Sequence, residues 1–136
     1  MIRKILVGFD GSKSARRALA FARDLAGQTN AKVTVLSVLE PPMAVDGYVN
    51  LAQQPAATEA LQKVLDEATA GLPAGLFDKR VEIGGVAEVL CEQAGRLEAD
   101  LVVVGARGLS AGGRWLLGSV SDRVVHHAGR PVTVIH

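Results

Sequence analysis

The order of apolar and polar positions along the chain predicts strands that alternate with helices. Five apolar or β-rich runs are typical of strands, and they cover residues 1–9, 32–40, 77–83, 100–105 and 131–136. Four segments between them carry apolar residues at helical spacing, and they begin after Ser12, at Thr58, after Gly85 and at Ser119. Such alternation is typical of an α/β fold with a parallel sheet. We therefore predict a doubly wound sheet of five parallel strands with helices on both faces.

Local residues predict where several of these helices begin and end. Ser12 is a good N-cap for the first helix, and Gly27 stands where that helix would stop. Residues 41–57 hold three of the five prolines and show little periodicity, which predicts a long loop before the second helix. Ser119 and Asp122 have the spacing of a capping box, which predicts the start of the last helix.

Length and composition fit one globular domain that spans residues 1–136. The first residues do not predict a signal peptide, and no run of roughly 20 apolar residues would span a bilayer, so we expect a cytoplasmic protein. The net charge of +1 gives no reason to expect a nucleic acid or a membrane as a partner. Cys91 is the single cysteine, and we interpret it as a thiol packed in the core.

Two segments that follow strands carry the residues best suited to chemistry. The first is GFDGS at residues 8–12, and the second is GARGLSAGGRWLLGS at residues 105–119. In a doubly wound sheet, ligands bind beyond the carboxyl ends of the strands, where the winding reverses direction. If the reversal falls between the first and fourth strands, the two segments face each other across one crevice.

The glycine-rich second segment suits an anion, and a phosphate in particular. Glycines allow successive backbone amides to form a concave nest, and the following helix adds its N-terminal amides and dipole. Ser119 and Ser121 add hydroxyl donors, while Arg107 and Arg114 add fixed positive charge. Two alternatives stay open: the segment is a surface loop without a ligand, and Asp10 in the first segment is a turn residue.

The spacing of the glycines also resembles a known signature. Gly105-x-x-Gly108, nine further residues and then Gly118-Ser119 resemble the G-2x-G-9x-G-[S/T] signature of the nucleotide-binding universal stress proteins. The flanking stretches KILVGFDGS and DLVVVGARG, and the segment from Gly118 to the last residue, look like that family as well. The resemblance implies a sheet of strand order 3-2-1-4-5 in a small cytoplasmic dimer that binds an adenine nucleotide, usually ATP.

The resemblance also implies which residues contact the nucleotide. Asp10 matches an acidic position near the ribose and phosphates, where it could hold Mg²⁺ together with phosphate oxygens. Val38 matches a position whose backbone meets the adenine. The implied contacts are Phe9, Asp10, Val38, Val104, Gly105, Arg107, Gly108, Gly118, Ser119, Val120 and Ser121. Phe9 and Trp115 depart from the smaller or aliphatic residues usual in the family, and the ring of Phe9 could narrow the mouth of the site.

Three functions stay open at this point. The first, favoured by the resemblance, is an ATP-binding sensor or regulator in a stress response that acts on an unidentified protein partner. The second is a slow ATP hydrolase or phosphotransferase, although Asp10 is the one carboxylate expected in the site and we assign no catalytic residue. The third is a dimeric interaction module without nucleotide. We expect a homodimer for each of the three, because residues 131–136 would form an exposed sheet edge that a second copy could cover.

Overall fold

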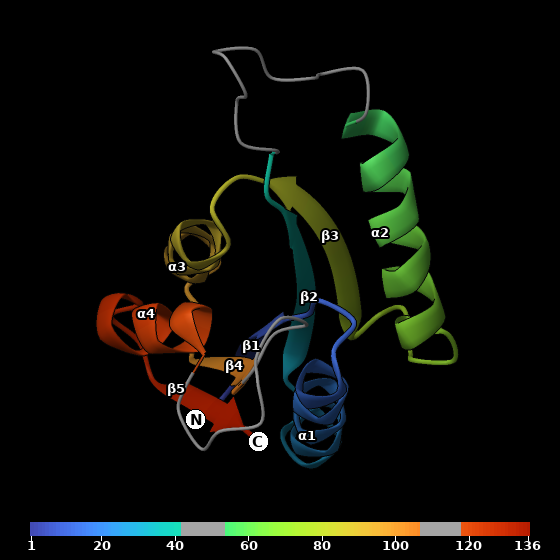
Figure 1. Ribbon diagram of the computed structural model, residues 1–136. Coiled ribbons are helices and arrows are strands. Elements are labelled where there is room, and N and C mark those ends of the chain that lie inside the picture. The colour runs from blue at the N-terminus through green and yellow to red at the C-terminus, as the bar shows by residue number, and fades with distance from the viewer. Residues whose placement is uncertain (42–53, 107–117) are drawn as a thin grey trace.

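The computed structural model describes residues 1–41, 54–106 and 118–136, and it contains the predicted alternation of strands and helices. The elements are β1 (Lys4–Gly8), α1 (Lys13–Thr29), β2 (Lys32–Leu39), α2 (Gln54–Thr69), β3 (Phe77–Ile83), α3 (Val86–Arg96), β4 (Leu101–Gly105), α4 (Ser119–His127) and β5 (Val132–Ile135). The strands form one parallel sheet in the order β3-β2-β1-β4-β5, which confirms the predicted fold class. Helices α1 and α2 lie on one side of this sheet, and α3 and α4 lie on the other (Figure 1).

The alternation of side chains along the strands divides the core into two clusters. Ile5 and Val7 of β1 pack with α1, α2 and neighbouring strand residues on one face. Leu6, between them, packs with α3 and α4 on the opposite face. Each of these three side chains is at most 2% exposed, so β1 is buried on both faces as its apolar run predicts.

Helix α2 begins at Gln54, so the loop predicted over residues 41–57 extends too far. Residues 42–53 lie outside the described part of the chain. Pro55 was a poor guide to the loop, because proline is tolerated in the first turn of a helix, where its missing N–H would have no partner within the helix. Ala56 and Ala57 follow it, and alanine has the highest helix propensity.

One other predicted helix end and one predicted cap are wrong, whereas the predicted start of α4 at Ser119 is confirmed. Helix α1 continues past Gly27 to Thr29, and it ends at Asn30, whose left-handed backbone (φ 55°) lets its N–H donate to the Ala26 carbonyl. Asparagine tolerates this conformation better than most residues. At the start of α4 the N-cap is Gly118, without a side-chain capping hydrogen bond, so Ser119 is already the first helical residue and no capping box with Asp122 forms.

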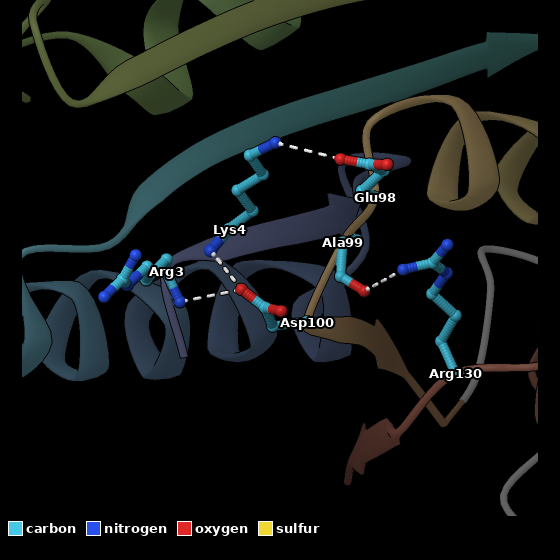
Figure 2. Close-up of polar contacts among 6 residues, drawn as sticks. All are labelled: Arg3, Lys4, Glu98, Ala99, Asp100 and Arg130. Carbon is cyan, nitrogen blue, oxygen red and sulfur yellow. Dashed lines mark hydrogen bonds and ion pairs between the residues drawn. The ribbon is translucent and has the colours of Figure 1, made fainter. Parts of the chain in front are cut away.

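The amino ends of β1 and β4 are fastened by side chains that Figure 2 shows. The Asp100 carboxylate accepts hydrogen bonds from the backbone N–H groups of Arg3 and Lys4 at 2.9 and 3.0 Å. These two bonds hold the pKa of the Asp100 carboxyl below its ordinary value. The Arg130 guanidinium donates to the Ala99 carbonyl at 3.0 Å. This bond joins the segment that precedes β5 to the segment that precedes β4. These contacts fix the amino ends of the strands, and the predicted site lies at the carboxyl ends of the same strands.

Two further features concern the chain as a whole. Cys91 packs half-buried against the core on the α3 and α4 side, which confirms the packed thiol. Its burial, and secondarily the nearby Glu88 carboxylate, raise the pKa of the thiol, so it is a poor nucleophile at neutral pH. None of the helices in the described ranges has the length and apolar character needed to cross a membrane.

Candidate functional site

A cavity of about 390 Å³ opens at the carboxyl ends of the central strands. The chain leaves β1 toward β2 on one side and later returns to β4 on the other, so the winding reverses between β1 and β4 as the sequence predicts. Both strand ends, β2, α3 and the start of α4 contribute to the walls. The lining residues are Gly8, Phe9, Asp10, Ser12, Ala15, Leu36, Val38, Val86, Leu90, Val104, Gly105, Ala106, Gly118, Ser119, Val120 and Ser121.

The segment after β1 forms a tight turn at the edge of this cavity. Gly11 has a φ of +82°, a conformation that a side chain disfavours. The Asp10 carboxylate accepts a hydrogen bond from the Ser12 N–H at 2.9 Å, and the Ser12 hydroxyl in turn accepts from the Ala15 N–H at 3.2 Å. Asp10 is therefore a turn residue, and its exposed side chain also borders the cavity. The two interpretations of Asp10 are compatible.

Phe9 is held in place by both its backbone and its ring. The Phe9 N–H donates to the Leu36 carbonyl at 2.9 Å, and the buried Ser37 hydroxyl donates to the Phe9 carbonyl at 2.7 Å. The ring is 3% exposed and packs in the α1-side core, with the Arg16 guanidinium carbon 5.8 Å from its centroid. Phe9 is therefore a fixed part of the core that also borders the cavity.

Gly105, at the end of β4, allows a close approach between the sheet and helix α1. A Cβ atom at this position would lie 2.8 Å from the Ser14 carbonyl carbon and 2.9 Å from the Ala15 nitrogen. Real Cβ atoms essentially never approach backbone atoms this closely. The first glycine of the signature is thus required by packing, whether or not a ligand is bound.

The first turn of α4 presents backbone donors to the cavity. The Gly118 N–H donates to the Ala106 carbonyl at 2.6 Å, and the Ser121 hydroxyl contacts the Ala106 and Gly118 carbonyls at 3.2 and 3.0 Å. These bonds fix the start of α4 against the end of β4. The amides of Ser119, Val120 and Ser121 have no partner within the helix, and no side chain caps them among the residues that the structure describes. Together with the helix dipole they attract an anion.

One wall of the cavity is apolar. Val38, which the resemblance to the family implied, lies there with Leu36, Val86 and Leu90, and Val120 adds a further aliphatic surface. Such a wall suits a flat, largely apolar ring. The cavity thus combines an apolar side with an anion-attracting end.

Several lining residues were not predicted, although their patterns held a signal. Leu36 lies two positions before Val38 and therefore on the same face of β2. Val86 and Leu90 are four apart on the apolar face of α3. The residues outside the predicted set are Gly8, Ser12, Ala15, Leu36, Val86, Leu90 and Ala106. Of the predicted set, Arg107 and Gly108 lie outside the described residues, while the other nine border the cavity.

Acidic groups are sparse around the cavity. Asp10 is the one carboxylate among its described lining residues. Within the described ranges, no group of three or more His, Cys, Asp or Glu side chains is placed to hold a metal ion. From the described lining residues, a cation here would therefore receive one carboxylate ligand, that of Asp10.

Comparison with known proteins identifies the family. The model of the universal stress protein family matches residues 1–136. The chain belongs to the universal stress protein family. A universal stress protein of Thermus aquaticus, named for the QAH/OAS sulfhydrylase 3′ region, is 36% identical to it over 142 aligned positions that cover 99% of both chains. The resemblance drawn from the glycine signature is thus confirmed.

Solved structures of universal stress proteins share the fold. UspA from Lactobacillus plantarum is 27% identical, with a TM-score of 0.78 and coverage of 99% of this chain and 98% of that one. A universal stress protein solved in complex with cAMP is 30% identical, with a TM-score of 0.70 and coverage of 99% and 97%. The match therefore covers nearly the whole length of this chain and of both structures.

Proposed function

We propose that this universal stress protein binds an adenine nucleotide, with ATP as the first candidate, in the cavity between the ends of β1 and β4. The observation that carries the proposal is the first turn of α4, whose amides have no partner within the helix and line the same cavity as an apolar wall. The relative that is 30% identical was solved with cAMP, an adenine nucleotide, and this supports the ligand class.

The chemistry of the walls suggests how the parts of the nucleotide would be recognised. The apolar wall around Val38 and Leu90 suits the adenine ring, and the α4 amides at Ser119 and Val120 suit phosphate oxygens. Asp10 is placed to contact the ribose or to share a Mg²⁺ ion with phosphates, since one carboxylate plus phosphate oxygens is a common magnesium site. Arg107 and Gly108 belong to the proposed phosphate-binding segment as well.

We propose that the protein acts as a nucleotide-dependent regulator rather than through turnover. Hydrolysis or phosphotransfer requires positioned acid–base groups, and Asp10 is the one such group among the described residues of the cavity. A phosphate-release assay with ATP and Mg²⁺ tests this point. Release well above the buffer rate, lost in Asp10→Asn, would favour an enzyme.

The assembly and location are part of the same proposal. We propose a single domain over residues 1–136, in a cytoplasmic homodimer that acts on a protein partner. Among the strands that the structure describes, β5 pairs with β4 alone, so its other edge is the one we propose a second copy covers. A two-fold partner would pair the same strand, Val132–Ile135, with itself. Light scattering at micromolar concentration tests the dimer, and a monomer would exclude it.

Isothermal titration calorimetry with ATP, ADP, AMP and cAMP tests the binding site. Ser119→Asp places a carboxylate at the exposed first residue of α4, where it suits the helix dipole but repels phosphates. We expect this variant to fold normally and to bind ATP at least about tenfold more weakly than the wild type.

The matched control for this experiment is Ala56→Asp. It adds the same charge to the first turn of α2, away from the cavity, and should leave ATP affinity unchanged. Equal ATP affinity in Ser119→Asp and the wild type would exclude the α4 site. If folded wild-type protein gives no binding heat with any of the four nucleotides at millimolar concentration, the proposal as a whole is wrong.

A further inference from the structure

A second cavity, of about 400 Å³, lies at the opposite end of the sheet. It is formed by the amino ends of β1, β2 and β3, by the turn before β3 and by the end of α3. Its charged lining residues are four cations, Lys4, Lys32, Arg80 and Arg96, and one carboxylate, Asp78. This preponderance of cations differs from the described lining of the first cavity, where backbone amides attract an anion.

The sheet places three of these cations, Lys4, Lys32 and Arg80, on one face. Leu6 and Leu36 pack against α3 and α4, so Lys4 and Thr34, two positions before them, point to the same side. Lys4 and Lys32 are register partners on β1 and β2, which brings the two side chains to neighbouring strands about 4.8 Å apart. Two like charges in this arrangement repel each other.

Three of the four cations form ion pairs with carboxylates of the protein. Arg80 contacts Asp78 at 2.9 Å and Arg96 contacts Glu92 at 2.7 Å. Lys4 lies 3.7 Å from Glu98, the longest of these contacts, and Figure 2 shows this ion pair. All three pairs are solvent-exposed and leave further N–H donors of each cation available.

Lys32, the fourth cation, has no such carboxylate partner among the described residues. Among the described residues the structure gives its side chain neither an ion pair nor a hydrogen bond, although it adjoins Lys4. Arg96, by contrast, is placed in the last turn of α3, where a cation complements the helix dipole. The unpaired lysine beside a second lysine is the feature that a bound anion would explain.

The geometry points to a second ligand site in this cavity, for a small phosphate-bearing molecule held by Lys4, Lys32 and Arg80. The Thr34 hydroxyl lies beside them in the lining and supplies a neutral donor. Leu76, Phe77 and Leu97 form an apolar border, which suits an ester whose remaining part is apolar. This site is separate from the proposed nucleotide cavity and does not depend on it.

Amide chemical shifts recorded by NMR test this site while reporting on both cavities separately. Two probes are titrated up to about 10 mM, a range that detects dissociation constants near millimolar. Inorganic phosphate represents the free anion, and phenyl phosphate represents an ester with an apolar group. We expect saturable shifts at Thr34, Arg80 and Leu97 with at least one probe. Tighter binding of phenyl phosphate would indicate an ester, and equal binding would indicate free phosphate.

Lys32→Gln removes the unpaired cation, and Lys63→Gln, on the exposed surface of α2, is the control of equal charge. We expect Lys32→Gln to weaken probe binding at least about fivefold, and Lys63→Gln to leave it unchanged. Without a probe, Lys32→Gln should be at least as stable as the wild type, because a repulsion is removed. Shifts confined to Gly8, Gly105 and Gly118, or equal affinities in Lys32→Gln and the wild type, would overturn the assignment.

Discussion

The substitution Gly105→Ala separates a packing role of the glycine signature from a ligand-binding role. The new Cβ would meet the Ser14 hydroxyl at 2.4 Å, the Ser14 carbonyl carbon at 2.8 Å and the Ala15 nitrogen at 2.9 Å. A hydroxyl can rotate away, but the two backbone atoms belong to the first turn of α1 and move only with the helix. Relief therefore requires α1 to shift from β4, along which it packs in the core.

Two opposing effects determine how much Gly105→Ala changes the free energy of unfolding. Inserting a methyl group into a packed core costs about 1–3 kcal/mol, and a contact with backbone belongs in the upper part of that range. Replacing glycine by alanine also restricts the unfolded chain, which returns about 0.4–1 kcal/mol. We expect Gly105→Ala to lower the free energy of unfolding by about 1–2.5 kcal/mol, and the midpoint of thermal unfolding by about 4–10 °C for a domain of this size.

Urea and thermal unfolding of nucleotide-free protein measure this effect. Gly27→Ala is the matched control, because Gly27 is helical and a Cβ there would have no heavy atom within 4 Å. It should stabilise the protein by up to about 1 kcal/mol. If Gly105→Ala is as stable as the wild type but no longer binds nucleotide, the packing argument is wrong and Gly105 acts on the ligand.

Two further predictions concern hydrogen bonds that fix the ends of β1. Asp100→Asn should destabilise the protein at neutral pH, because the Asp100 carboxylate accepts from the Arg3 and Lys4 amides and its pKa is lowered. Because its pKa is lowered in the folded state, the Asp100 carboxylate stabilises the folded protein at pH values above 3.8. The difference in unfolding free energy between wild type and variant should therefore shrink as the pH falls through and below that value. Urea unfolding between about pH 2 and pH 7 measures this difference, and a difference that does not depend on pH would contradict the proposed cause. Ser37→Ala should cost about 1 kcal/mol in urea unfolding, because the buried hydroxyl donates to the Phe9 carbonyl at 2.7 Å; unchanged stability would show that this bond contributes nothing net.

The fold was predictable because its signals are local and periodic. Strands such as Leu101–Gly105 are buried on both faces and therefore appear as continuous apolar runs. Helices show their apolar stripe, and the Ser12 cap of α1 was identified correctly from residue type. The strand order followed from the family resemblance, since periodicity alone does not determine which strands pair.

The incorrect predictions concern positions where two residue types fit one conformation, or where one residue type fits two kinds of structure. Asn30 ends α1 in the left-handed conformation that Gly27 was expected to supply, and both residues tolerate it. The prolines of residues 41–57 predict a loop, but proline also fits the first turn of a helix, where Pro55 lies. Local sequence does not distinguish these alternatives, because the choice depends on where the helix meets the sheet.

The apolar half of the cavity was harder to predict than its polar half. Asp10, Gly118 and Ser119 stood out because they follow strands or begin a helix. Leu36 and Leu90 look like ordinary core residues, and they are: each is at most 2% exposed and packs in the α3-side core. Only the three-dimensional arrangement shows that the same side chains also border an open space.

The glycine signature therefore combines constraints of different physical origin. Gly105 is required because α1 lies against the sheet there, and this holds in the free protein. Gly118 begins α4 without a side-chain cap, which leaves amides for a ligand and costs the free protein about a few tenths of a kcal/mol relative to a capping side chain. The first glycine thus supports the fold, whereas the last gives up a little stability in exchange for donors. A serine or aspartate at position 118 would cap the helix with its own side chain, and the resulting gain in stability would come from the same amides that the proposed nucleotide requires.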